Sequence, residues 1–374
     1  MREILEGAIE FAKRNGSFSI INACKAAKNV CIFGTGRYFE EAFDTWKYKE
    51  NLCVNLLCDN NPEKWGTSIK GLPCISPDDL ANMDDIIVIP LIGNRLSVIK
   101  QLNDLKIRFF LPEYYGLECI ANTPRNLEWF SQNRILDVYD ILADDESKKV
   151  YASVICNRIA FGQYWYDSLC SSGEYFSAVF APDNNEVYLD CGAYIGDTVL
   201  KFIEAVPPAQ SGAKFREIHA FEVDSNNFVM LEKTAASLRL KENNNNIHCY
   251  HMAVWNENTT LSFGKEEHGH NESVSVNKTG DSFMTQTVPA VKIDDLAGNA
   301  TLIKMDIEGA ELNALKGAEN TIIKNAPKLT ICLYHKLEDF WEIPIYLKTI
   351  MPDYKFFVRH HSNDYGGTVL YAYK

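Results

Sequence analysis

Residues 187–206 read VYLDCGAYIGDTVLKFIEAV. An apolar run ends at Asp190, glycines follow at Gly192 and Gly196, and an amphipathic pattern begins at Asp197. Glycine has no Cβ atom to keep a ligand away from the backbone, and the first turn of a helix presents unpaired N–H groups. This order of strand, turn and helix predicts a cofactor site, with Asp190 orienting a cation or an amino group of the cofactor.

A second acidic position follows the next apolar strand, in the sequence IHAFEVD that contains Glu222. A carboxylate can accept hydrogen bonds from both hydroxyls of a ribose. In NAD-binding folds this acid lies about 20 residues beyond the glycines of GxGxxG. Here Glu222 lies 222 − 192 = 30 residues beyond Gly192, and the glycine pattern is DxGxxxG. Both differences disfavour NAD in this half of the chain.

Residues 187–374 carry a longer ordered set of motifs: VYLDCGAYIGDT, IHAFEVD, MAVWNE, ESVSV, VKIDDL, LIKMDIEGAELNALKGAENTI, LYHKLEDFWEIP and RHHS…GGTVLYA. As a set they resemble the FkbM-type S-adenosylmethionine-dependent methyltransferases. The resemblance implies an α/β class I methyltransferase fold with a seven-stranded, Rossmann-like sheet and a terminal antiparallel strand. It further implies O-methylation of a sugar or natural-product hydroxyl. The cofactor-binding residues would be Asp190, Gly192, Ala193, Tyr194, Gly196, Asp197, Thr198, Glu222, Val223, Ala253 and Asp306.

Four residues after later strands are candidates for the chemistry: Asp306, Glu308, His335 and Lys336. Ligands of open α/β sheets bind at the carboxyl ends of the strands, and methyl transfer to oxygen requires removal of a proton. His335 is the expected base because histidine titrates near neutral pH, and Lys336 could bind the acceptor. Asp306 and Glu308 are expected to point to opposite sides, so that they need not act together. They could instead have no chemical role, with Glu308 only favouring the next helix N-terminus.

The N-terminal part has its own alternation of strands and helices, with apolar runs NVCIFGT, CVNLLCD, IIVIPL and IRFFLP. It predicts a small Rossmann-like unit. Phe39 replaces the third glycine of GxGxxG, while Asp59 has nearly the spacing of a ribose-binding acid. The segment CDNNPEKWGTSIKGLPCISPDDL resembles the N-terminal domains of sugar-modifying enzymes. A nucleotide site is predicted at Gly34, Gly36, Arg37 and Asp59; the alternative is a structural or docking domain.

Three segments are therefore expected: a Rossmann-like domain over 1–122, a helical linker over 123–182, and a methyltransferase domain over 183–374. The net charge is 37 − 50 = −13 without a Lys/Arg run, which disfavours nucleic acid as a partner. No run approaches the roughly 20 apolar residues of a membrane span. The N-terminus resembles an amphipathic helix more than a signal peptide, and the eleven scattered cysteines favour reduced thiols, so we expect a cytoplasmic protein.

The leading hypothesis is an S-adenosylmethionine-dependent O-methyltransferase that acts on a small-molecule or saccharide acceptor. A divalent metal is possible but not favoured, and the sequence does not indicate an oligomeric state. One alternative is a non-catalytic module that binds S-adenosylmethionine or a nucleotide sugar. Another is an NAD-dependent sugar-nucleotide oxidoreductase that uses the N-terminal cleft.

Overall fold

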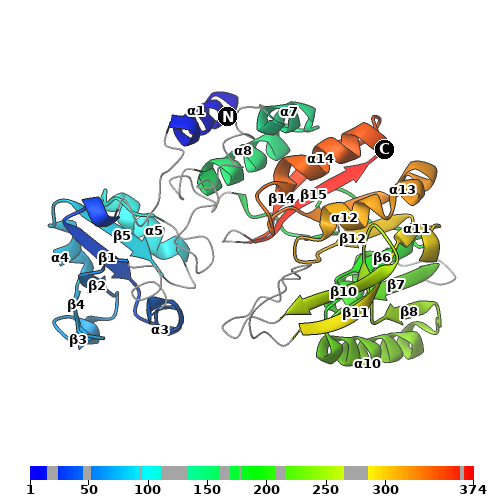
Figure 1. The fold of residues 1–374 in the computed structure, drawn as a ribbon, viewed down its shortest axis with the longest axis horizontal. Helices are drawn as coiled ribbons and strands as arrows, with labels where there is room; N and C mark the ends of the chain where they lie inside the picture. The colour runs from blue at the N-terminus through cyan, green and yellow to red at the C-terminus, as the bar shows by residue number, and fades with distance from the viewer. Residues whose placement is uncertain are drawn as a thin grey trace. The chain divides into compact units, whose positions relative to one another are not determined.

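The computed structural model describes residues 1–14, 24–44, 52–91, 95–110, 134–159, 169–176, 178–207, 215–264, 285–362 and 366–374. The chain divides into two compact units (Figure 1). The first comprises Met1–Tyr139, Lys148–Cys170 and Ser362–Tyr365, and the second Asp140–Ser147, Ser171–His361 and Gly366–Lys374. The predicted linker, 123–182, is thus shared between the two units. Its described part includes two helices, α7 (Arg134–Ile141) and α8 (Asp145–Ile159).

The first unit has a five-stranded sheet in the order β3-β4-β2-β1-β5. Its strands are β1 (Asn29–Phe33), β2 (Leu56–Cys58), β3 (Ser68–Ile69), β4 (Leu72–Ile75) and β5 (Ile86–Pro90), and its helices include α1 (Arg2–Arg14), α3 (Arg37–Asp44), α4 (Pro77–Ala81) and α5 (Arg95–Asp104). β1, β2 and β5 pair in parallel, as the apolar runs predicted, and β4 pairs in parallel with β2. The sequence reading missed the β3–β4 hairpin. The run IRFFLP was expected as a strand; its described residues, 107–110, form an isolated bridge between Phe109 and Val88.

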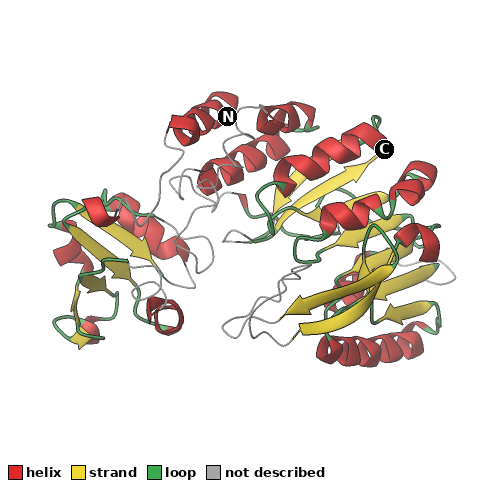
Figure 2. Cartoon of the chain, in the orientation of Figure 1, coloured by secondary structure: helices red, strands yellow, loops and turns green. Residues whose placement is uncertain are grey.

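The second unit contains a seven-stranded sheet in the order β14-β15-β13-β12-β6-β7-β8. Strands are drawn in yellow in Figure 2 and are labelled in Figure 1. Its strands are β6 (Val187–Cys191), β7 (Glu217–Phe221), β8 (Ile247–Tyr250), β12 (Leu302–Met305), β13 (Lys328–Cys332), β14 (Lys355–His360) and β15 (Thr368–Tyr373). β15 runs antiparallel to both of its neighbours, and the other pairings are parallel. This arrangement confirms the predicted class I methyltransferase fold.

Six helices of this unit are α9 (Asp197–Ala205), α10 (Ser225–Glu242), α11 (Ile293–Leu296), α12 (Glu311–Lys316), α13 (Glu319–Asn325) and α14 (Asp339–Ile350). Every residue of β6 is buried, as expected of a central parallel strand covered on both faces. On one face, Phe202 of α9 stacks on Tyr188 at 4.4 Å between ring centroids. Leu231 of α10 joins the same apolar cluster. Asp190 follows Tyr188 on that face, at the carboxyl end of the strand.

A separate three-stranded sheet is formed by β9 (Ala253–Val254), β10 (Thr259–Gly264) and β11 (Thr285–Val291). The run IHCYHMAVW forms two strands rather than one. It bends at His251–Met252, so that β8 pairs with β7 while β9 pairs with β11.

Within the described residues, no helix is long and apolar enough to cross a membrane. The cysteines in the same part of the chain are all free thiols.

Candidate functional site

The glycine-containing turn after β6 packs directly against the segment that follows β12. Gly192 has φ +82°, and a Cβ atom built on it would lie 1.9 Å from the backbone oxygen of Asp306. The backbone N–H of Asp306 also donates to the Cys191 carbonyl at 3.0 Å. Gly192 therefore satisfies two requirements at once, a left-handed backbone and a close backbone approach. The sequence predicted glycine here for approach of a ligand, but the nearest neighbour is the protein itself.

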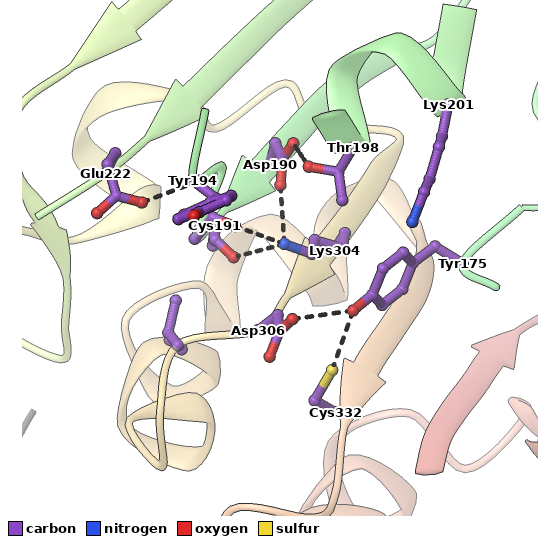
Figure 3. Close-up of polar contacts among 12 residues, drawn as sticks. Tyr175, Asp190, Cys191, Tyr194, Thr198, Lys201, Glu222, Lys304, Asp306 and Cys332 are labelled. Carbon is purple, nitrogen blue, oxygen red and sulfur yellow. Dashed lines mark hydrogen bonds and ion pairs between the residues drawn. The ribbon is translucent and has the colours of Figure 1, made fainter. Parts of the chain in front are cut away.

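Glu222, just beyond β7, lies beside this turn (Figure 3). Its Oε2 accepts the backbone N–H of Tyr194 at 2.9 Å, and its Oε1 accepts that of Asp224 at 2.7 Å. The two parts of the predicted cofactor site, 30 residues apart in sequence, are thus joined by a hydrogen bond. Each carboxylate oxygen has a second lone pair for another donor. The Tyr194 side chain is 54% exposed beside this carboxylate.

The N-terminus of α9 completes this side of the site. Its N-cap, Gly196, has a left-handed backbone and makes no side-chain cap hydrogen bond, so the cap residue itself satisfies none of the first N–H groups of the helix. Thr198, in the first turn, donates instead to the Asp190 carboxylate. Asp197 is the acidic residue of the first turn.

Asp190 lies beneath the turn and is completely buried. Its carboxylate forms an ion pair with Lys304 of β12, at 3.1 Å from Nζ to Oδ1. The two residues are register partners on adjacent parallel strands. Burial raises the pKa of Asp190, against the opposing effect of Lys304. For Lys304, burial lowers the pKa, but the charges of Asp190 and Asp306 outweigh it and the net shift is upward. With no exposed surface, Asp190 can shape the turn but cannot touch a ligand at its side chain.

Lys304 also holds the turn from below. Its Nζ donates to the Gly192 carbonyl at 2.6 Å, and it lies 5.3 Å from the ring centroid of Tyr175 (Figure 3). Sequence reasoning selected neither Lys304 nor Tyr175 as a site residue. A lysine inside an apolar strand was the available signal for Lys304, since an unpaired buried charge is costly. Tyr175 precedes β6 in a segment without a recognisable pattern.

Asp306 follows β12 and faces three side chains. Tyr175 donates its hydroxyl to Oδ2 at 2.9 Å, and Tyr334 donates to Oδ1 at 2.8 Å. His335 Nε2 is 3.4 Å from Oδ1. Burial raises the pKa of Asp306, but Lys304, His335 and the two hydroxyls lower it further, so that the net shift is downward. Asp306 is therefore held as a carboxylate.

His335 lies among three carboxylates from the segment after β12. Its Nδ1 is 2.8 Å from Glu311 Oε1, and its Nε2 is 3.4 Å from Asp306 and 3.6 Å from Glu308 Oε2. Burial lowers the pKa of His335, but the three charges overcome this effect and raise the pKa to about 9. The imidazole is thus mostly protonated at neutral pH.

The expectation that Asp306 and Glu308 point to opposite sides was wrong, because both approach His335 Nε2. β12 ends at Met305, and Glu308 adopts a left-handed backbone with φ +55°. The expectation also misapplied strand alternation, which places residues i and i+2 on the same face of a strand. Lys336 lies over Gly309, whose carbonyl accepts a hydrogen bond from Nζ. This contact occupies one of the three donors of the ammonium group.

The remaining predicted cofactor residues surround the same edge of the sheet. Ala193 is buried, and its N–H donates to Phe221 O at 2.9 Å. Ala253 is buried in β9, within a small apolar cluster against which Val223 packs. His251 Nε2 approaches the Val223 carbonyl at 3.0 Å.

In the first unit, the carboxylate of Asp59, which was predicted to bind a nucleotide, accepts hydrogen bonds from residues of the same chain. Asp59 Oδ2 accepts from the Thr35 hydroxyl at 2.6 Å and from Lys64 Nζ at 2.9 Å, and Oδ1 accepts from Asn61 N at 2.9 Å. Burial opposes ionisation of Asp59, but these donors lower its pKa to about 2. Gly34 has φ +103°, and Gly36 and Arg37 are exposed at the start of α3. The Asp59 carboxylate thus makes bonds within the chain at the position where a ribose would need it.

No group of three or more His, Cys, Asp or Glu suited to a metal ion occurs in the part of the chain that the structure describes.

Comparison with known proteins adds a family to this geometry. The sequence model of the methyltransferase FkbM domain matches residues 190–364. A crystal structure of methyltransferase FkbM from Methylobacillus flagellatus KT is similar over 100% of this chain and 99% of that chain, with 23% identity and a TM-score of 0.73. An rRNA methylase from Streptococcus thermophilus covers 51% of this chain and 88% of its own, with 10% identity and a TM-score of 0.31, which is too low to support an inference. No curated protein sequence matches this chain.

Proposed function

Because residues 190–364 carry a methyltransferase FkbM domain, we propose that this chain transfers the methyl group of S-adenosylmethionine to a hydroxyl of a sugar or natural product. The observation that carries the proposal is the hydrogen bond between Tyr194 N and Glu222, which joins the glycine turn to an acid suited to a ribose. The cofactor supplies an electrophilic methyl group on a sulfonium when it is bound.

The residues fit such a cofactor in three ways. The turn from Gly192 to Gly196 and the first turn of α9 present backbone to the site, without a side-chain cap from Gly196. A carboxylate at the position of Glu222 can accept hydrogen bonds from ribose hydroxyls. Asp190 and Lys304 serve as positioning residues, because both are buried and hold the turn through Thr198 and the Gly192 carbonyl.

For the acceptor we propose His335 as the base, with Asp306 and Glu308 beside it. His335 Nε2 would take the proton of the hydroxyl while the electron pair remains on the oxygen. Its raised pKa makes it a stronger base but leaves only a small neutral fraction at pH 7. The rate of methyl transfer should therefore rise with pH up to about 9. Holding the acceptor in line could lower the barrier by roughly 7–11 kcal/mol, and a base could add about 10²–10⁴-fold.

Calorimetric titration with S-adenosylmethionine and with NAD, separately, tests the cofactor. We expect binding of S-adenosylmethionine only, with a strong loss of affinity in Glu222→Ala. Glu204→Ala, at an exposed glutamate of α9, is the matched control and should bind normally. Binding of NAD alone would remove the proposal. A screen of free sugars, nucleotide sugars and natural-product alcohols, read by a mass increase of one methyl group, would identify the acceptor.

A further inference from the structure

Two buried carboxyl groups, Glu311 and Asp339, belong to the surroundings of His335, and Glu311 contacts its ring at Nδ1. Glu311 is the first residue of α12 and Asp339 the first residue of α14, two helices that pack against each other. Glu311 is completely buried and Asp339 is 2% exposed. Acidic residues are rarely buried to this degree without a partner, so the contacts of each oxygen decide what the pair does.

The two carboxyl groups have unequal partners. Glu311 Oε1 accepts the Ile307 N–H at 2.9 Å and faces His335 Nδ1 at 2.8 Å. Glu311 Oε2 and Asp339 Oδ2 are both buried, and neither has a hydrogen-bond partner among the described residues. Two ionised carboxylates could not leave such oxygens unpaired without a large desolvation cost. If the two groups shared one proton, the carboxylic acid of Asp339 could donate a hydrogen bond and the carboxylate of Glu311 could accept it.

The contacts also indicate which carboxyl group holds that proton. Glu311 receives two donors, which stabilise its negative charge. Burial, followed by the charge of Glu311, raises the pKa of Asp339 to about 8. Glu338 raises this pKa further, whereas Lys336 and His335 lower it. Asp339 is thus mostly a neutral acid at pH 7.

We propose that Asp339 donates its proton to Glu311 Oε2, and that this carboxyl pair holds His335 with Nδ1–H on Glu311 and Nε2 toward Asp306 and Glu308. The proposal rests on the proposed function for its catalytic meaning. Glu311 and Asp339 are positioning residues, since they act through His335. When a hydroxyl proton bonds to Nε2, Glu311 stabilises the resulting imidazolium while Asp339 keeps its own proton. A serine-protease aspartate supports its histidine by the same division of roles.

Two measurements on the full chain test the pair without any methyl transfer. An infrared difference spectrum of wild type minus Asp339→Asn at pH 7 should contain the carbonyl band of a neutral carboxylic acid. NMR titration of labelled histidine, with His335 assigned by its loss in His335→Gln, should give a pKa near 9 in the wild type. In Glu311→Gln this pKa should fall towards the ordinary value of 6.5. In Asp339→Asn it should stay near 9, because the amide still donates to Glu311.

Three outcomes would overturn the proposal: no carboxylic-acid band, an unchanged His335 pKa in Glu311→Gln, or an equally large fall in Asp339→Asn. The last result would mean that Asp339 is ionised. Both substitutions preserve size, and unfolding curves close to wild type would show that the fold is intact.

Kinetics add a test that depends on the proposed function. Glu311→Gln should lower kcat by roughly 10²-fold with little change in KM for the cofactor, and should move the pH–rate profile to lower pH. Asp339→Asn should lower kcat less than Glu311→Gln does, because the amide can still donate to Glu311. If no acceptor is ever methylated, the proposed function is wrong. The spectroscopic measurements still test the carboxyl pair independently of that result. Unchanged kcat in Glu311→Gln, in an active enzyme, would contradict the positioning role.

Discussion

Replacement of Gly192 by alanine tests the packing of the glycine turn against the segment after β12. The new Cβ atom would lie 1.9 Å from Asp306 O and 2.9 Å from the Asp306 carbonyl carbon, far inside van der Waals contact. A backbone carbonyl cannot rotate away as a side chain could, so the turn or the segment must move. Overpacking of this kind costs about 1–3 kcal/mol. The left-handed φ of +82° adds about 1–2 kcal/mol for a residue with a Cβ atom.

The matched control is Gly71→Ala. Gly71 has φ +80°, but nothing lies within 4 Å of a Cβ built there, so this variant incurs the conformational cost without the clash. Urea unfolding, with hydrogen exchange resolved to each unit, should show a loss of about 2–5 kcal/mol for Gly192→Ala in the second unit. The difference from Gly71→Ala isolates about 1–3 kcal/mol of steric cost.

Gly192→Ala should also reduce cofactor binding, because the shift displaces the turn that carries Tyr194 N. Equal losses of stability in Gly192→Ala and Gly71→Ala would refute the argument. Such a result would show that the contact with Asp306 relaxes without any loss of folding free energy.

Three further predictions concern charge. Lys304→Met should destabilise the second unit by about 3–5 kcal/mol in urea unfolding, because it leaves Asp190 buried without its partner. The double variant with Asp190→Asn should recover much of this loss. Additive losses in the double variant would contradict the pairing. Because the pKa of His335 is raised from 6.5 to about 9, its stabilising effect is complete below pH 6.5 and is lost as pH rises through 9. This amounts to roughly 3 kcal/mol, and His335→Gln should abolish that pH dependence of unfolding. For Asp59, whose pKa is lowered from 3.8 to about 2, the effect is complete above pH 3.8 and is lost as pH falls through 2. We expect roughly 2 kcal/mol, and acid unfolding of Asp59→Asn that matches wild type would argue against it.

The local motifs of the cofactor side could be predicted because each is a short segment with a physical rule. An apolar strand followed by glycines and a helix indicates a ligand-binding turn wherever it occurs. The alternation of strands and helices likewise indicates a parallel sheet. The closeness of Tyr194 and Glu222 follows from the same rules once β6 and β7 are neighbours, because adjacent parallel strands end at the same edge of the sheet.

Other features depend on register and on the exact end of a strand, which apolar patterns do not specify. The pairing of Asp190 with Lys304 requires that β6 and β12 be neighbours, although 114 residues separate the two side chains (304 − 190 = 114). The approach of Glu308 to His335 occurs beyond the end of β12 at Met305, where Glu308 has a left-handed backbone. The proposed pairing of Glu311 with Asp339 depends on the packing of α12 against α14.

The sequence by itself thus determined the class of fold, the turn after β6 and the acid after β7, because local periodicity and glycine placement are properties of short segments. The tertiary structure alone decided that Asp190 supports the turn from below, that Asp59 makes bonds within its own unit, and that His335 carries a positive charge at neutral pH. The physical reason is that burial and electrostatic partners set a charged group's role, and both are supplied by residues distant in sequence.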